Sequence, residues 1–121
     1  MRTNLRRDLT VALKARDRVA VAALRSALAA IENAEAPSAD VSESATVANE
    51  HVAGSAVGLG AGEGDRRDLT EADLRAIIEA EVRERSDAAG EYEQSGHHDA
   101  ARRLRSEADV LGRYLPSAQP G

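Results

Sequence analysis

Two side chains of opposite charge, Glu81 and Arg85, are spaced so that they could act together in binding or catalysis. On a helix they are one turn apart, and each projects about 20° from Leu74, in the middle of an apolar arc. Glu35 projects onto the apolar side of an earlier helix in the same way, a turn beyond Ile31. Such charges form either a buried ion-pair network or a binding site, and we favour the network because unpaired buried charge is costly. No nucleophile, oxyanion donor or cofactor loop accompanies them, so no catalytic residue is predicted.

Two further patterns could hold a ligand. His97, His98 and Asp99 are possible metal ligands, but adjacent side chains on a helix point about 100° apart and cannot both face one ion unaided. The glycines at 58–64 resemble a phosphate-binding loop, yet neither a strand nor a Gly-Lys pair accompanies them. We interpret the histidines as solvated and the glycines as linker, and we expect no metal and no cofactor.

Positive charge is concentrated near the amino terminus. Residues 1–34 carry seven basic and three acidic groups, residues 35–65 carry six acidic groups and no basic one, and the whole chain has a net charge of −5. The chain has no Phe or Trp for stacking bases, which disfavours sequence-specific recognition of single strands, and its net acidity argues against DNA. Contact with the backbone of a folded RNA stays open. The candidate RNA-contacting residues are Arg6, Arg7, Lys14, Arg18 and Arg25.

The elements that must position these residues all follow a helical repeat, and no segment alternates as a strand does. We predict an all-α fold, a small bundle of four main helices over about 4–14, 18–34, 70–94 and 99–114, arranged as two helical hairpins. Asp17 and Thr70 are expected to cap helix starts, while Gly96 and Pro116 mark helix ends. The predicted apolar faces are Leu5, Leu9, Ala12 and Leu13; Val21, Leu24, Leu28 and Ile31; Leu74, Ile77, Ile78, Val82, Ala89 and Tyr92; and Ala101, Leu104, Ala108, Leu111 and Leu115.

The chain reads as one domain over 1–116 followed by a tail at 117–121. A segment over 36–69 is acidic and rich in Gly, Ser and Ala, which favours a flexible insert, with a short helix within 44–52 as an open alternative. There is no cysteine, so neither a disulfide nor a thiolate metal site can form. No apolar run suits a signal peptide or a membrane span, and we expect a cytoplasmic protein.

Several short motifs, taken in order, resemble those of the GatB/YqeY family. They are Lys14-Ala-Arg16-Asp17, Leu24-Arg25, Ile31-x-Asn33-Ala-Glu35, Leu69-Thr-x-x-Asp-Leu74, Glu81 with Arg83 and Arg85, and Leu111-x-x-Tyr114-Leu115-Pro116. The resemblance implies an all-α YqeY-like domain related to the tail region of the B subunit of the tRNA-dependent amidotransferase. It also implies a polar network made of Arg16, Asp17, Asn33, Glu35, Glu81 and Arg85. The family's carboxy-terminal tail domain would follow Pro116, where this sequence has only five residues.

Two functions compete on this basis. The resemblance implies a non-catalytic, tRNA-associated accessory module linked to amide transfer from glutamine, a carbon–nitrogen ligation, with tRNA or a tRNA-processing protein complex as partner. The alternative is a helical protein–protein interaction module with no RNA role. The basic amino-terminal helices favour the first and the acidic insert favours the second, while an independent enzyme is the weakest interpretation.

Overall fold

The computed structural model describes residues 1–36 and 67–116, and within them the fold is all-α without a strand. The helices are α1 (Arg2–Ala15), α2 (Arg18–Glu35), α5 (Glu71–Gln94) and α6 (His98–Gly112). Every predicted helix is present, with each end within two residues of the prediction. Residues 37–66 of the predicted insert, including the possible helix at 44–52, lie outside the described residues. None of the described helices combines the length and apolar character needed to cross a membrane.

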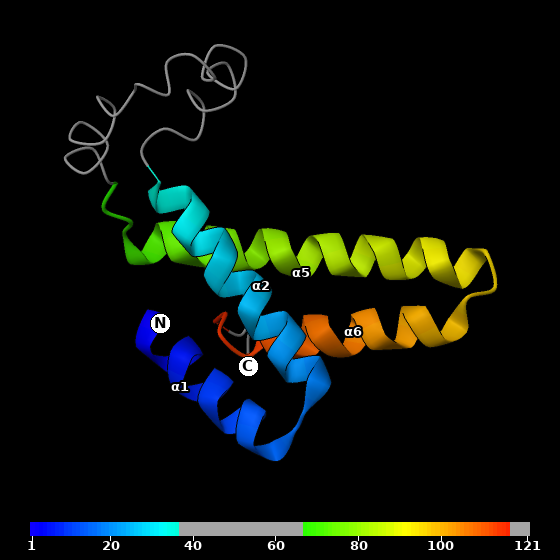
Figure 1. Cartoon of the computed structure of the whole chain (residues 1–121). Helices are drawn as coiled ribbons and strands as arrows, with labels where there is room; N and C mark the ends of the chain where they lie inside the picture. Colours follow the sequence, from blue (N-terminus) through cyan, green and yellow to red (C-terminus); the bar gives the residue numbers. More distant parts are fainter. Residues whose placement is uncertain (37–66, 117–121) are drawn as a thin grey trace, which may run out of the picture.

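The helices form the two predicted hairpins, as Figure 1 shows. Helices α5 and α6 run antiparallel and pack most extensively on each other. Helix α2 crosses this pair and contacts both members, whereas α1 packs chiefly on α2. The crossing of α2 is therefore the place where the two hairpins become one domain.

Local signals account for where the helices begin and turn. The Asp17 carboxylate accepts a hydrogen bond from the Ala20 N–H at 3.1 Å and caps α2. Thr70 and Asp73 form a reciprocal capping box at 2.9 and 3.0 Å, and the Thr70 N–H lowers the pKa of the Asp73 carboxyl. Gly96 has φ of 83° in the turn before α6, as predicted. The sequence did not indicate that Arg16 would adopt the left-handed conformation, with φ of 58°, at the end of α1.

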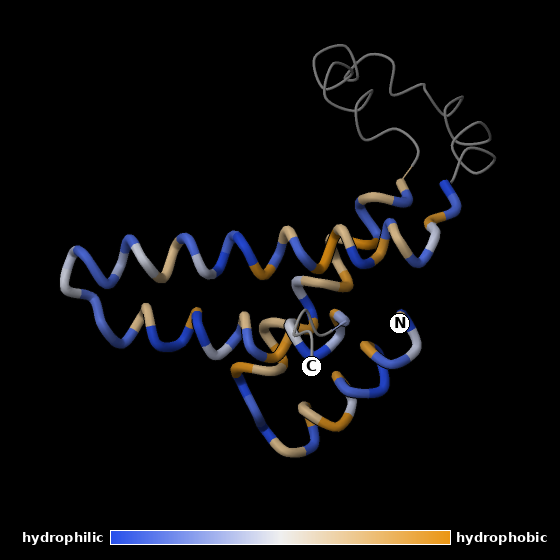
Figure 2. Tube along the Cα trace, turned by 180° about the vertical axis from the view of Figure 1, so that it is seen from behind, coloured by the Kyte–Doolittle hydropathy of each residue, from blue (hydrophilic) through white to orange (hydrophobic). Residues whose placement is uncertain are grey.

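Small side chains dominate the core where the hairpins meet. The largest fully buried side chains are Leu5, Leu24, Ile31, Ile78 and Leu111. Around them lie alanines of α2 that the predicted apolar face did not include, namely Ala20, Ala23 and Ala27. Figure 2 shows the hydrophobic stretches gathered around the α2 crossing, while the far end of the α5–α6 hairpin is mostly hydrophilic. Helix α2 buries a broad arc because α1 covers one side of it and the α5–α6 pair covers another.

Two residues predicted on apolar faces and one predicted helix end are wrong. Leu13 and Tyr92 are 46% and 43% exposed, because each projects to a side of its helix that the neighbouring helix does not fully cover. Helix α6 ends at Gly112, and residues 113–115 turn before Pro116 instead of continuing the helix to Tyr114. Periodicity places a residue on a face, but it does not show how far the neighbouring element extends.

The two ends of the segment outside the described residues lie next to each other. The Arg67 N–H donates a hydrogen bond to the Glu35 carbonyl oxygen at 3.2 Å, so the chain leaves α2 and returns at the same place. We predict that deleting Ser38–Gly64 leaves the melting temperature nearly unchanged, because a short connection can join these ends and loop-closure entropy varies slowly with length. Thermal unfolding followed by circular dichroism checks this, and a large drop would show that the deleted residues pack on the domain.

The alanine seam of α2 yields a second prediction. Ala27 is fully buried at the crossing, whereas Ala29 on the same helix is exposed. Ala27→Leu should lower the free energy of unfolding by about 1–3 kcal/mol, because the added methylenes have no space. Ala29→Leu adds the same atoms and should change it by no more than about 0.5 kcal/mol. Equal effects in urea denaturation would contradict the packing described above.

Candidate functional site

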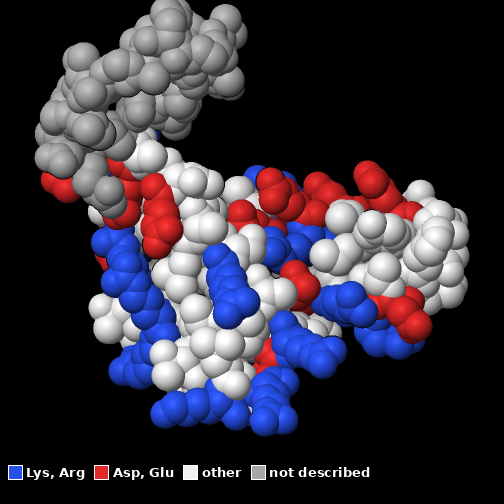
Figure 3. Space-filling model, viewed as in Figure 1, with Lys and Arg blue, Asp and Glu red and all other residues white. Residues whose placement is uncertain are grey.

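The predicted RNA-contacting residues lie on one hairpin and all of them are exposed. They are Arg6, Arg7 and Lys14 on α1, and Arg18 and Arg25 on α2. Figure 3 shows Lys and Arg side chains spread over α1 and the first half of α2, whereas Asp and Glu side chains gather along α5. None of the five forms an ion pair with a carboxylate of the described part of the chain.

Three of the four carboxylates of the same hairpin are engaged elsewhere, and the fourth, Glu32, is exposed in the last turn of α2. Asp8 accepts a hydrogen bond from the Tyr114 hydroxyl, Asp17 caps α2, and Glu35 pairs with Arg2. These three carboxylates therefore lie beside the end of α6 or at the ends of α2. The outer surface of the hairpin, which we call the basic face and define by Arg6, Arg7, Lys14, Arg18 and Arg25, therefore keeps its positive charge.

The turn between α1 and α2 brings the two parts of the basic face together. In its left-handed conformation Arg16 donates its N–H to the Leu13 carbonyl at 3.2 Å, and the Asp17 N–H bonds the Ala12 carbonyl at 2.9 Å. Two residues thus reverse the chain, so Lys14 and Arg18 lie at the same end of the hairpin. The resemblance did not predict this conformation, although it singled out Arg16 and Asp17.

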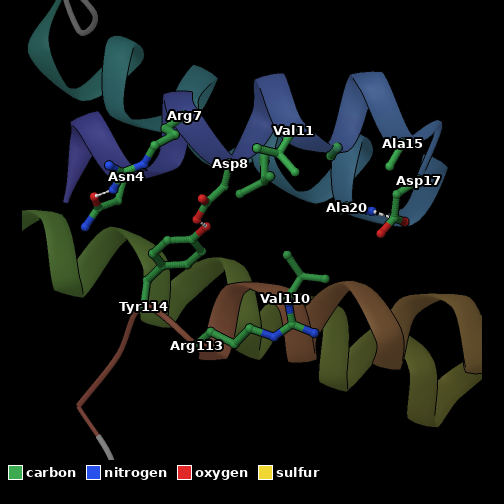
Figure 4. Close-up of a pocket in the computed structure, with 12 residues that line it drawn as sticks. Asn4, Arg7, Asp8, Val11, Ala15, Asp17, Ala20, Val110, Arg113 and Tyr114 are labelled. Carbon is green, nitrogen blue, oxygen red and sulfur yellow. Dashed lines mark hydrogen bonds between the residues drawn. The ribbon is translucent and has the colours of Figure 1, made fainter.

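A cavity of about 590 Å³ opens between the α1–α2 hairpin and the end of α6. Figure 4 shows Val11 and Val110 facing each other across it, with Asp8 and Tyr114 bonded at one end and Asp17 at the other. Burial and the bond to Asp8 raise the pKa of the Tyr114 hydroxyl well above its usual value. Tyr114 therefore stays a neutral donor that holds α1 against the end of α6. With both carboxylates so engaged, the cavity offers surface for contact more than a group for chemistry.

The predicted pair of Glu81 and Arg85 belongs to a larger interior network. The Arg85 guanidinium contacts a Glu81 oxygen through Nη1 and a Glu107 oxygen through Nε, both at 2.9 Å. The Ser26 hydroxyl donates to the same Glu81 oxygen at 2.7 Å. The three charged side chains are only 12–14% exposed, so the network links α2, α5 and α6 from inside. This geometry agrees with the interpretation as an ion-pair network that holds the helices in register.

Sequence reasoning missed Glu107 and Ser26, which complete this network. Glu107 lies between Leu104 and Leu111 on the apolar arc of α6, the same signal that identified Glu81 and Arg85. It could therefore have been found. Ser26 carries no such signal, because a serine on a helix is found as readily in solvent as in the interior.

The polar network implied by the resemblance is divided among separate places. Glu81 and Arg85 lie in the interior, Arg16 and Asp17 form the α1–α2 turn, and Glu35 bonds Arg2 at the end of α2. Asn33 is exposed near that end. The structure thus brings together Glu81 and Arg85, and leaves the other four members at two separate places on the α1–α2 hairpin.

The histidines at the α5–α6 turn make local contacts. His98 Nδ1 lies 2.8 Å from a Glu93 oxygen, and His97 Nδ1 lies 2.9 Å from the Ser95 hydroxyl. Arg105 and His98 together lower the pKa of the Glu93 carboxyl. Asp99 pairs with Arg102 at 3.2 Å. Over residues 1–36 and 67–116, no group of three or more His, Cys, Asp or Glu side chains is placed to hold a metal ion.

Comparison with known proteins identifies the family. A family model described as Yqey-like protein matches residues 59–120, so the chain belongs to the YqeY-like family. This match takes in α5 and α6, whereas α1 and α2 with the basic face precede it. No curated protein and no solved structure gives a significant match.

The interior network leads to a stability prediction. Arg85→Met should lower the free energy of unfolding by about 3–5 kcal/mol, because Glu81 and Glu107 are left largely buried without a counterion. Replacing all three charges together, as Glu81→Leu, Arg85→Met and Glu107→Leu, should cost less than the single change. Arg83→Met alters an exposed arginine of the same helix and serves as the control. Strictly additive effects in chemical denaturation would show that the network is solvated.

Proposed function

We propose that this YqeY-like chain is a non-catalytic accessory module that contacts tRNA through the basic face of its α1–α2 hairpin. It would act in the cytoplasm beside tRNA-dependent amide transfer from glutamine, a carbon–nitrogen ligation that other proteins catalyse. Family membership supports the connection with the helical region of the amidotransferase, as the sequence resemblance implied. The binding role itself depends on the hairpin.

The observation that carries the proposal is the exposure of five basic side chains on two adjoining helices, none of them paired with a carboxylate of residues 1–36 or 67–116. Phosphate contacts release counterions and need no base-specific geometry, so an exposed basic surface is sufficient for them. The chain as a whole is acidic, and Figure 3 places acidic side chains along α5. An RNA would therefore be oriented toward the hairpin and repelled from the opposite end.

The second candidate is a helical protein-interaction module without an RNA role. The observation that favours it is the exposure of Val11 and Leu13 on α1, which are 59% and 46% exposed. Apolar side chains at this level of exposure suit a protein surface better than they suit phosphate. The two candidate functions predict different effects of salt concentration and of charge reversal on the binding of tRNA.

The tRNA proposal predicts a salt-dependent affinity that charge reversal weakens. We would measure binding of total tRNA by the whole chain and by an Arg6/Arg7/Lys14→Glu variant at several salt concentrations. Each lost phosphate contact should reduce the slope of log affinity against log salt by about 0.7 to 0.9, so three lost contacts reduce it by about 2 to 3.

A matched variant separates the site from net charge. Arg83/Arg102/Arg105→Glu makes the same charge change at exposed positions of α5 and α6. It should leave the salt slope nearly as it was. If the native chain binds no tRNA at low salt, the protein-interaction candidate stands alone. If both variants lose affinity equally, the basic face is not the site.

A further inference from the structure

A shallow groove lies at the elbow between α1 and α2, on the side away from the cavity of Figure 4. It has a volume of about 400 Å³ and is lined by Leu13, Arg16, Arg18, Val21, Ala22 and Arg25. We call it the elbow groove. Leu13, which the helical pattern placed in the core, is 46% exposed here, and Val21 is half-buried beside it. These side chains form an apolar floor that no described element covers.

The rim of the elbow groove is positively charged. Arg16, Arg18 and Arg25 are all exposed, and no carboxylate is among the residues that line the groove. Asp17 lies between two of these arginines in sequence, but it caps α2 and lines the other cavity. None of the three arginines forms an ion pair with a carboxylate in residues 1–36 or 67–116. The groove is therefore apolar at its centre and cationic around it.

We propose that the elbow groove binds an acidic amphipathic helix of a partner protein. Apolar side chains of that helix, spaced by three or four residues, would cover Leu13, Val21 and Ala22. Carboxylates that flank them would pair with Arg16, Arg18 and Arg25. This is the recognition mode in which an amphipathic helix lays its apolar face into a groove and charges at the rim set its orientation.

The floor of the groove distinguishes this occupant from RNA. A phosphate backbone would satisfy the arginines but would leave the exposed Leu13 in water. The groove has no aromatic side chain on which a base could stack. An uncharged apolar helix would cover Leu13 but would leave three guanidinium groups without counterions. An acidic amphipathic helix would both cover the apolar floor and pair with the arginines. This inference goes beyond the tRNA proposal and does not depend on it.

The experiment is a selection of random displayed peptides against the whole chain, followed by fluorescence anisotropy with the selected peptides. Selection should enrich peptides with large apolar residues at helical spacing and flanking Asp or Glu. Leu13→Ser and Ala22→Asp should each weaken binding about tenfold or more, since one removes an apolar anchor and the other places a carboxylate among the arginines. Both positions are exposed, so the melting temperature should fall by no more than a few degrees.

Val11→Ser is the matched control, because Val11 is the more exposed apolar residue of α1 and lines the other cavity. It should leave peptide binding unchanged. Selection of peptides that bind the Ala22→Asp chain equally well would overturn the proposal, as would failure to enrich acidic peptides. If Leu13→Ser weakens binding of total tRNA, the groove belongs to an RNA site instead. If a synthetic peptide of residues 37–66 displaces the selected peptides, the occupant is the chain's own acidic segment and no partner is needed.

Discussion

The arrangement of the domain depends on one guanidinium shared between two largely buried carboxylates. Arg85 joins Glu81 on its own helix to Glu107 on α6, and Ser26 brings α2 to the same point. Removing these groups from water is costly, and their mutual contacts offset that cost only in this geometry. A slide of any of the three helices by one turn would leave charge buried and unpaired. The network therefore selects a single register for helices whose apolar faces are otherwise rather uniform.

That selection matters because the surrounding core is made of small side chains. Ala20, Ala23 and Ala27 allow α2 to approach the α5–α6 pair closely, but alanines interlock weakly and permit several alignments. Helix α1 lies outside this seam. Its contacts with the other hairpin include the ion pair of the amino-terminal Met1 with Glu71 and the bond between Asp8 and Tyr114. The interior network thus joins α2, α5 and α6, whereas α1 packs on the outside of α2 and adds Leu5 and Ala12 to the core.

Charged side chains are arranged differently in the interior of the domain and on the outer surface of the α1–α2 hairpin. In the interior and at the helix ends, carboxylates are held by Arg85, by Arg2 and by backbone N–H groups. The outer surface of the α1–α2 hairpin keeps arginines without acidic partners among the described residues. The family match covers α5 and α6, which supply most of the scaffold, whereas the surface proposed to bind tRNA and an acidic helix belongs to α1 and α2. Each proposed ligand would meet basic side chains that the fold does not use for its own stability.

The sequence by itself determined the all-α class, the approximate extent of the four helices and the presence of Glu81 and Arg85 on an apolar face. These features follow from local patterns, namely the 3.6-residue repeat, the Asp17 and Thr70 caps and Gly96. Only the tertiary structure decided which faces are covered. It left Leu13 exposed, joined Asp8 to Tyr114 across the length of the chain, and placed Ser26 and Glu107 beside the predicted ion pair. Periodicity defines the direction in which a side chain projects, whereas its burial and its partner depend on elements distant in sequence.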